Sequence, residues 1–250
     1  MSDIATIWED FELPSKGLVY DKPINPKVSL RSMTTLEEMK RQSPTDTPYK
    51  VMSDIIEGCM KNKPDIHVHD MCIGDYQFLL HKLRIITYGP EYNMIVTCPK
   101  CGETTESVGD LDSLEVMEWT DEISGQMLIS LPITNKSIQL KFQTPRDLDL
   151  IAFRNKEMKK KTKTPIDYSL LFTLMSLIKK VDGMILTDIQ LEDFVKSLPL
   201  KDVNFILTKA NELNKKVGLD TQIKVKCAEC GEEVTSTFRI TSEFFGPAIY

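Results

Sequence analysis

The hydrophobic and polar positions of this 250-residue chain switch repeatedly between a helical and a strand-like spacing. Helices are predicted where apolar residues recur at helical spacing after a capping residue or a proline, often with a glycine near the last of them. Short alternating runs between turn residues predict strands. We therefore expect helices over residues 35–42, 49–60, 73–87, 145–158, 165–180, 187–197 and 200–216, and strands over residues 27–33, 92–97, 103–108, 126–131, 137–142, 222–226 and 234–240. The predicted fold class is α+β.

Two Cys-x-x-Cys turns lie between predicted strands, in the segments Cys98-Pro-Lys-Cys101-Gly102 and Cys227-Ala-Glu-Cys230-Gly231. Two cysteines at this spacing fit two positions of a tetrahedral zinc site, and the glycine permits the positive φ that turns backbone N–H groups toward the sulfurs. Each turn with its flanking strands is therefore predicted to be a zinc-ribbon-like β-hairpin. The predicted ligands of one shared structural Zn²⁺ are Cys98, Cys101, Cys227 and Cys230.

Two other interpretations of these cysteines stay open, namely a disulfide within each turn or four free thiols. A redox Cys-x-x-Cys motif normally opens a helix after a strand, whereas both turns here lie between two strands. Four thiolates would also fill the coordination sphere of zinc and leave no position for a reactive water, which disfavours a catalytic metal.

The two turns are far apart in sequence, with 125 residues between Cys101 and Cys227. The segments before them resemble each other, because Asp75-Tyr-Gln-Phe-Leu-Leu80 aligns with Asp202-Val-Asn-Phe-Ile-Leu207. Tyr49–Ile56 and Val28–Arg31 align in apolar pattern with Tyr168–Met175 and Ile138–Lys141 in the same order. We expect an internal duplication, with convergence of generic helix patterns as the alternative.

The expected architecture is two helical lobes from this duplication, each ending in a zinc-ribbon-like hairpin, joined at the shared four-cysteine site. The predicted organisation is an extended N-terminal segment (1–26), a first repeat (27–125), a second repeat (126–243) and an aromatic C-terminal tail (244–250). Aromatic residues near both ends, such as Phe11 and Phe244, are expected to dock either on the protein itself or on a partner.

Composition indicates an ordinary globular protein, with 41% hydrophobic and 27% charged residues and a net charge of −6. The start lacks a signal-peptide pattern and no long apolar run occurs, so neither export nor membrane insertion is expected. Cys59 and Cys72 fall on apolar faces of predicted helices and are expected to be buried, as in a reducing compartment. His67 and His69 are expected to lie in a solvated loop. Phosphate-loop, serine-hydrolase and zinc-protease motifs are lacking, so we expect no enzymatic activity and no small-molecule substrate.

Several motifs of the first half carry a family resemblance: Leu13-Pro-Ser-Lys-Gly-Leu-Val-Tyr20, Val28-Ser-Leu-Arg31 before Thr35-Leu-Glu-Glu38, Gly74-Asp75-Tyr76, and Cys98-Pro-Lys-Cys101. Together they resemble the baseplate hub proteins of T-even-like contractile-tail bacteriophages. The resemblance implies a non-enzymatic role in building the central hub, either as a hub component or as an assembly chaperone. It also implies other hub proteins as partners, and a location in the host cytoplasm during assembly or in the tail baseplate of the virion. The resemblance implies no metal.

A zinc-ribbon protein that binds nucleic acid, for example in transcription, is the alternative function. Such ribbons contact phosphates through lysine and arginine around the cysteines. Here Lys100, Lys224 and Lys226 are offset by acidic neighbours, among them Glu229 and Glu232. The sequence therefore favours a protein partner over a nucleic acid.

Overall fold

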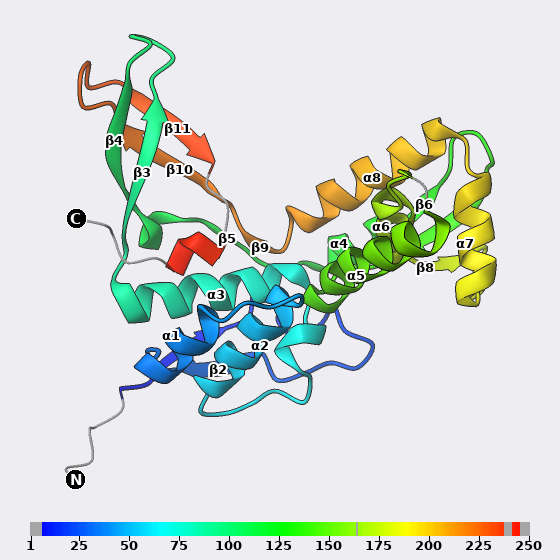
Figure 1. The fold of residues 1–250 in the computed structure, drawn as a ribbon, viewed down its shortest axis with the longest axis horizontal. Coiled ribbons are helices and arrows are strands. Elements are labelled where there is room, and N and C mark those ends of the chain that lie inside the picture. The colour runs from blue at the N-terminus through cyan, green and yellow to red at the C-terminus, as the bar shows by residue number, and fades with distance from the viewer. Residues whose placement is uncertain (1–6, 164, 238–241, 246–250) are drawn as a thin grey trace.

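The structure, a computed structural model, describes residues 7–163, 165–237 and 242–245. It combines helices with small antiparallel sheets in two lobes that lie side by side, and an arm of two β-hairpins stands away from them (Figure 1). The fold is thus mixed α and β, as the sequence predicts.

The first lobe begins with a short sheet and is completed by helices. Strand β1 (Glu9–Glu12) pairs antiparallel with β2 (Lys27–Leu30). The helices that follow are α1 (Thr35–Arg41), α2 (Pro48–Gly58), the 3-10 helix η1 (Val68–Asp70) and α3 (Ile73–Tyr88). Gly89, at φ 86°, ends α3, as its position after the apolar stripe predicts.

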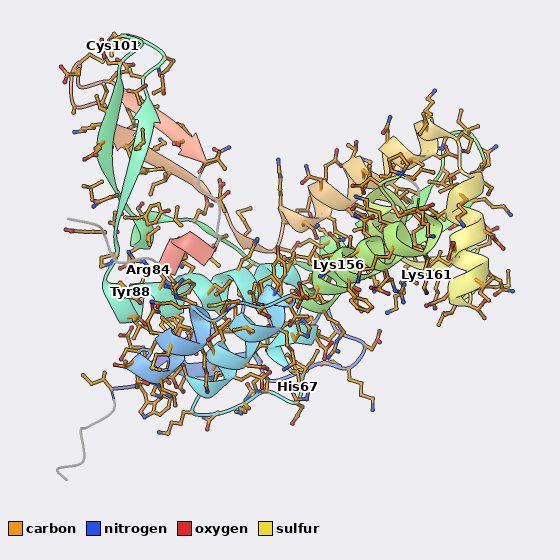
Figure 2. The ribbon with its side chains drawn as sticks, in the orientation of Figure 1. His67, Arg84, Tyr88, Cys101, Lys156 and Lys161 are labelled. Atoms are coloured by element: carbon orange, nitrogen blue, oxygen red, sulfur yellow. The ribbon has the colours of Figure 1, made fainter. Side chains whose placement is uncertain are left out.

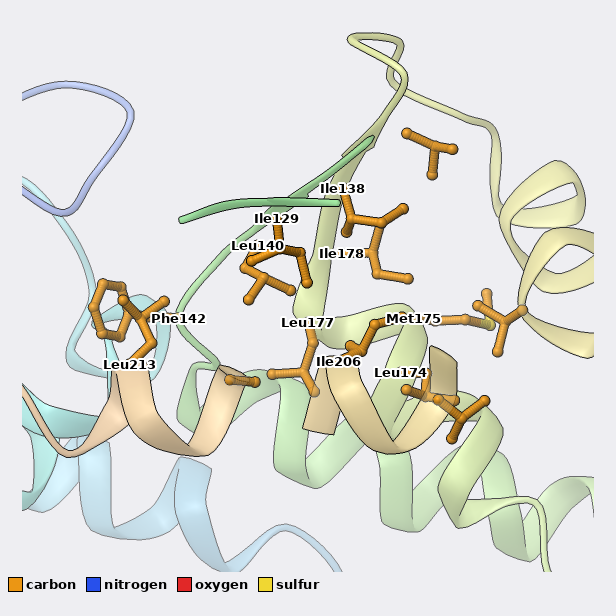
Figure 3. Close-up of a cluster of buried hydrophobic side chains, with 14 of the residues drawn as sticks. Ile129, Ile138, Leu140, Phe142, Leu174, Met175, Leu177, Ile178, Ile206 and Leu213 are labelled. Atoms are coloured by element: carbon orange, nitrogen blue, oxygen red, sulfur yellow. The ribbon is translucent and has the colours of Figure 1, made fainter. Parts of the chain in front are cut away.

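The second lobe is built on a three-stranded sheet in the order β6-β7-β8. Its elements are α4 (Asp121–Gln126), β6 (Leu128–Ser130), β7 (Ser137–Leu140), α5 (Pro145–Thr162), α6 (Ser169–Leu177), β8 (Ile178–Val181), α7 (Asp188–Ser197) and α8 (Leu200–Asn214). Figure 3 shows the packing of the sheet residues Ile129, Ile138 and Leu140 with Leu177 of α6 and Ile206 of α8.

The arm consists of hairpin β3 (Glu91–Thr97) and β4 (Thr104–Asp110), and hairpin β10 (Gln222–Lys226) and β11 (Glu233–Thr237). After β4 come the 3-10 helix η2 (Leu111–Ser113) and β5 (Val116–Met117), which pairs with β9 (Gly218–Leu219) at the base of the arm. The 3-10 helix η3 (Ser242–Phe245) lies between the arm and α3 (Figure 1). Phe244 and Phe245 are buried there, so this part of the aromatic tail docks on the protein itself. Residues 246–250 of the tail lie outside the described residues.

Two predictions of secondary structure were wrong in detail. The predicted helix 165–180 ends at Leu177, and Ile178–Val181 forms a strand instead. This strand pairs with β7 and buries its two β-branched residues, so the sheet offers hydrogen bonds that override the helical pattern. The predicted strand 126–131 is shorter in the structure, because Gln126 ends the helix α4 and the strand covers Leu128–Ser130.

His69 contradicts the expectation of a solvated loop histidine, because it is buried where the two lobes meet. Its Nε2 lies 3.0 Å from Asp149 Oδ2 of α5. The same carboxylate accepts hydrogen bonds from the backbone N–H groups of Tyr49 (3.3 Å) and Lys50 (2.8 Å), at the start of α2. Asp149 of the second lobe therefore caps α2 of the first lobe and holds the His69 ring in place. His67, by contrast, is exposed as expected.

The two halves share much of their order of elements: a strand, a Leu-Pro turn, a second strand, a helix with a Thr capping box, further helices and a hairpin. The second half adds strand β8 between its helices. Asp75 near the start of α3 accepts hydrogen bonds from the Ser15 backbone (2.9 Å), after Leu13-Pro14. Asp202 near the start of α8 accepts them from the Ile133 backbone (2.8 Å), after Leu131-Pro132. Both carboxylates are fully buried.

Candidate metal centre

The four predicted metal ligands come together at the tip of the arm, where Figure 2 labels Cys101. The Sγ atoms of Cys98 and Cys230 lie 3.7 Å apart, and those of Cys101 and Cys227 lie 3.8 Å apart. All four sulfurs lie within 4.8 Å of one another. Each close pair thus joins one hairpin to the other, although the two hairpins come from opposite halves of the chain.

These distances match a tetrahedral zinc site. A Zn–S bond of about 2.3 Å places the sulfurs of a regular tetrahedron about 3.8 Å apart. No disulfide joins any of the six cysteines, which disfavours the disulfide alternative. Cys59 and Cys72 are buried in the lobes as expected and do not join the cluster. Within the described ranges, this is the sole group of cysteine, histidine or acidic residues with a metal-binding arrangement.

Both cysteine turns have the same backbone hydrogen bonds. The Cys98 N–H donates to the Glu103 carbonyl (2.9 Å), and the Cys227 N–H donates to the Glu232 carbonyl (2.8 Å). The glycine of each turn then donates to the carbonyl of its first cysteine. The glycines, Gly102 at φ 78° and Gly231 at φ 70°, are needed for this conformation and not for space, since an added Cβ would meet nothing within 4 Å.

The site is supported from below by a small apolar cluster that is shared between the hairpins. Val96, Val225 and Val234 are buried there beside the first cysteine of each turn, with Met94 packed against them. Cys98 and Cys227 are buried, whereas Cys101 and Cys230 are exposed. Such a core is too small to hold four strands together strongly, so a metal held by the four cysteines would add to the stability of the arm.

The thiols of each turn differ in acidity. Hydrogen bonds from the backbone N–H groups of Cys230 and Glu229 lower the pKa of Cys227 to about 7, and those of Cys101 and Lys100 likewise lower the pKa of Cys98. The backbone N–H of Glu103 favours the Cys101 thiolate, but shielding from water and hydrogen bonds with the other three cysteines raise the pKa of Cys101 to about 12. Shielding from water, together with hydrogen bonds with Cys98 and Cys227, also raises the pKa of Cys230. A metal bound at the cluster would therefore displace protons from the second cysteine of each turn.

Sequence reasoning missed Gly109, which shapes the crossing of the hairpins below this site. Gly109 of β4 lies where the hairpins cross, and an added Cβ would be 2.4 Å from the Ile223 side chain of β10. A glycine inside a strand pattern is the signal that could have indicated this close approach. Lys100 pairs with Glu232 across the two turns at 2.5 Å, an exposed contact worth about 0–1 kcal/mol.

The four thiolates would leave zinc no open position, so the arrangement suits a structural metal and not a catalytic one. Across the part of the chain that the structure describes, none of the helices is both long enough and apolar enough to cross a membrane.

The comparisons with known proteins agree with the resemblance seen in the sequence. The family model for the T4 bacteriophage base plate protein matches residues 9–246, which include both lobes and both hairpins. No curated protein and no solved structure matches the chain. A family match over nearly the whole length confirms the recognition of a T4-like baseplate protein. The chain therefore belongs to the T4 bacteriophage base plate protein family.

Proposed function

We propose that this baseplate protein acts in assembly of the central hub, as a hub component or an assembly chaperone, and that one structural Zn²⁺ at Cys98, Cys101, Cys227 and Cys230 holds its arm together. The observation that carries the proposal is the four-sulfur cluster at zinc-like spacing in a chain of a baseplate family. Other baseplate proteins are the partners that the family implies.

The physical need for the metal supports its structural role. The arm has a core of a few valines and two cysteines, and two-stranded hairpins of this size are marginal in water. A bound zinc contributes on the order of 10 kcal/mol in small zinc peptides, and less where the rest of the chain already folds. Here both lobes have apolar cores of their own, so the metal would order the arm and not the whole protein.

We further infer that the two halves arose by duplication of one unit. The shared order of elements, the paired Thr34 and Thr144 capping boxes and the buried Asp75 and Asp202 support this inference. In this scheme β1 corresponds to β6, so the first unit would start near Glu9 and not at residue 27. Each unit would then supply one cysteine turn to the shared metal.

A non-enzymatic role has support from the family and from the closed coordination sphere. The proposed locations are the host cytoplasm during assembly and, for a hub component, the virion. Nucleic acid is a poor candidate partner for the β3–β4 hairpin, since exposed positions of its strands carry Glu91, Glu106 and Asp110 but no lysine or arginine.

The hub role is tested by purifying the chain from infected cells at successive times. A hub component should occur both in hub precursors and in finished particles, whereas an assembly chaperone should occur in hub precursors alone. Absence from hub precursors, together with its presence in another part of the baseplate, would contradict the proposal.

A further inference from the structure

The first hairpin of the arm has a solvent-facing surface that its own fold does not explain. Alternate residues of its two strands point outward and are all exposed, and we call this set the β3–β4 outer face: Glu91, Asn93, Ile95, Thr97, Thr104, Glu106, Val108 and Asp110. The opposite face is the one that packs in the arm, through Met94 and Val96. The outer face is therefore free to contact another molecule.

Two large apolar side chains lie next to each other on this face. Ile95 is 74% exposed and Val108 is 61% exposed. The register pairs Ile95 with Glu106 and Asn93 with Val108, so Ile95 and Val108 are diagonal neighbours on one face. A sheet with one face packed and one face in water normally alternates apolar and polar residues, which makes this pair unusual.

The same face carries negative charge without compensation. Glu91 lies directly opposite Asp110, an arrangement of like charges that destabilises a strand pair. Asp110 also accepts a hydrogen bond from the Asp112 backbone (3.0 Å), but no ion pair reaches Glu91, Glu106 or Asp110 from any described residue. A cationic group supplied from outside would relieve this repulsion.

The second hairpin provides an internal comparison. It forms the same turn 129 residues later, where Lys224 stands in the place of Ile95 and Thr237 in the place of Val108. Its exposed Lys224 is paired with Glu233 (3.3 Å). The hairpin fold and the cysteine turn therefore require neither the apolar pair nor the acidic surround, so these are features of the first hairpin alone.

The surroundings leave this face accessible. The arm stands clear of both lobes in Figure 1, and among the described residues β3 pairs with β4 alone. An open groove of about 700 Å³ runs from Val108 toward the second hairpin. Its wall adds the carboxylates of Glu115 and Asp220 to that of Asp110, and Lys224 and Lys226 of the second hairpin line it as well. On the β3–β4 outer face itself, the charged neighbours of the apolar pair are the acidic Glu91, Glu106 and Asp110.

We propose that the β3–β4 outer face binds a segment of another baseplate protein that presents apolar side chains next to lysine or arginine. Ile95 and Val108 supply the apolar contact, and Glu91, Glu106 and Asp110 pair with the cationic groups. This inference rests on the baseplate role of the protein, but it needs neither the hub assignment nor the identity of the metal.

The test uses the full-length protein and the other baseplate proteins of the same phage, each expressed singly and immobilised for biolayer interferometry. At least one should bind the unchanged chain, and higher salt should weaken the binding because charges contribute to it. The double variant Ile95→Lys with Val108→Thr, which copies the second hairpin, should weaken binding roughly tenfold or more. Glu106→Lys should also weaken it.

The matched control is Ile189→Lys on α7 of the second lobe, a side chain that is 75% exposed and far from the arm (Figure 1). This variant should bind like the unchanged chain. Metal content and circular dichroism of all variants exclude misfolding as the cause of lost binding. Binding by no baseplate protein, or equal binding by the double variant, would overturn the proposal. So would light scattering that shows a dimer of this chain broken by the double variant, because the face would then bind a second copy.

Discussion

The sulfur of Cys101 lies 3.8 Å from the sulfur of Cys227, although 125 residues separate the two cysteines in the chain. The intervening residues complete the first hairpin, form the second lobe and begin the second hairpin. A link between Cys101 and Cys227 therefore joins two hairpins that are far apart in the sequence. Long closed loops are those in which a link restricts the unfolded chain most. A metal at this contact would therefore act on the arm as a staple between the two halves.

Replacement of one buried cysteine should weaken metal binding strongly. We expect Cys227→Ser to weaken zinc affinity by roughly 100-fold or more, because three thiolates and a hydroxyl no longer match the four-thiolate site. Competition with a chromophoric chelator measures this affinity. Cys59→Ala, at a buried cysteine outside the cluster, should keep full affinity. Equal loss in both variants would indicate general unfolding and not a ligand role.

Removal of the metal should loosen the arm and leave the lobes folded. After chelation, amide hydrogen exchange should speed up roughly tenfold or more in β3, β4, β10 and β11, because the valine cluster alone holds them weakly. Exchange in β7, inside the larger core of the second lobe, should stay unchanged. Faster exchange in β7 would show that the metal supports the whole fold.

The buried aspartates should stabilise their lobes in the same way. Asp202→Ala leaves the backbone N–H groups of Ile133 and Thr134 without their acceptor, and Asp75→Ala does the same to Ser15. Each change should lower the free energy of unfolding by about 1–3 kcal/mol, as measured by urea denaturation. Asp193→Asn, on the exposed side of α7, should change it by less than about 0.5 kcal/mol. If either alanine variant kept full stability, Asp75 and Asp202 would no longer support the inference that the two halves are duplicates.

His81 should make the first lobe sensitive to mild acid. Burial lowers the pKa of His81 to about 4, while its Nε2 lies 2.9 Å from the Leu111 carbonyl. The unfolded chain takes up a proton on this histidine below about pH 6.5. The folded protein does so only below about 4, so stability falls as the pH decreases through this window.

At pH 5.5 the loss from His81 should reach about 1–1.5 kcal/mol relative to pH 7.5. Urea denaturation at both pH values measures it. A His81→Leu variant should lack this component, whereas His67→Gln, at an exposed histidine, should retain it. The same pH dependence in the His81→Leu variant would assign the effect to other groups.

The sequence predicts well those elements whose signals are local. The α3 helix starts at the predicted Ile73 and ends at the predicted glycine, and both cysteine turns form between strands as expected. The convergence of the four cysteines followed from their chemistry, because two ligand pairs imply one complete site.

Features that depend on residues far away in the chain could not be predicted from the sequence. His69 is buried because Asp149, 80 residues away, reaches it from the other lobe. Residues 178–181 became a strand because β7 lies beside them. In the sequence, Ile95 alternates with its neighbours just as a buried strand residue does. Only the packing of the two hairpins shows that it lies on the exposed face.

The most direct test of the central claim is zinc analysis of the purified protein, with the metal counted by native mass spectrometry and its ligands identified by X-ray absorption. We expect one Zn²⁺ per chain with four sulfur neighbours at about 2.3 Å. Two zinc ions per chain, no zinc, or a site with fewer than four sulfurs would contradict a single metal shared by the two halves.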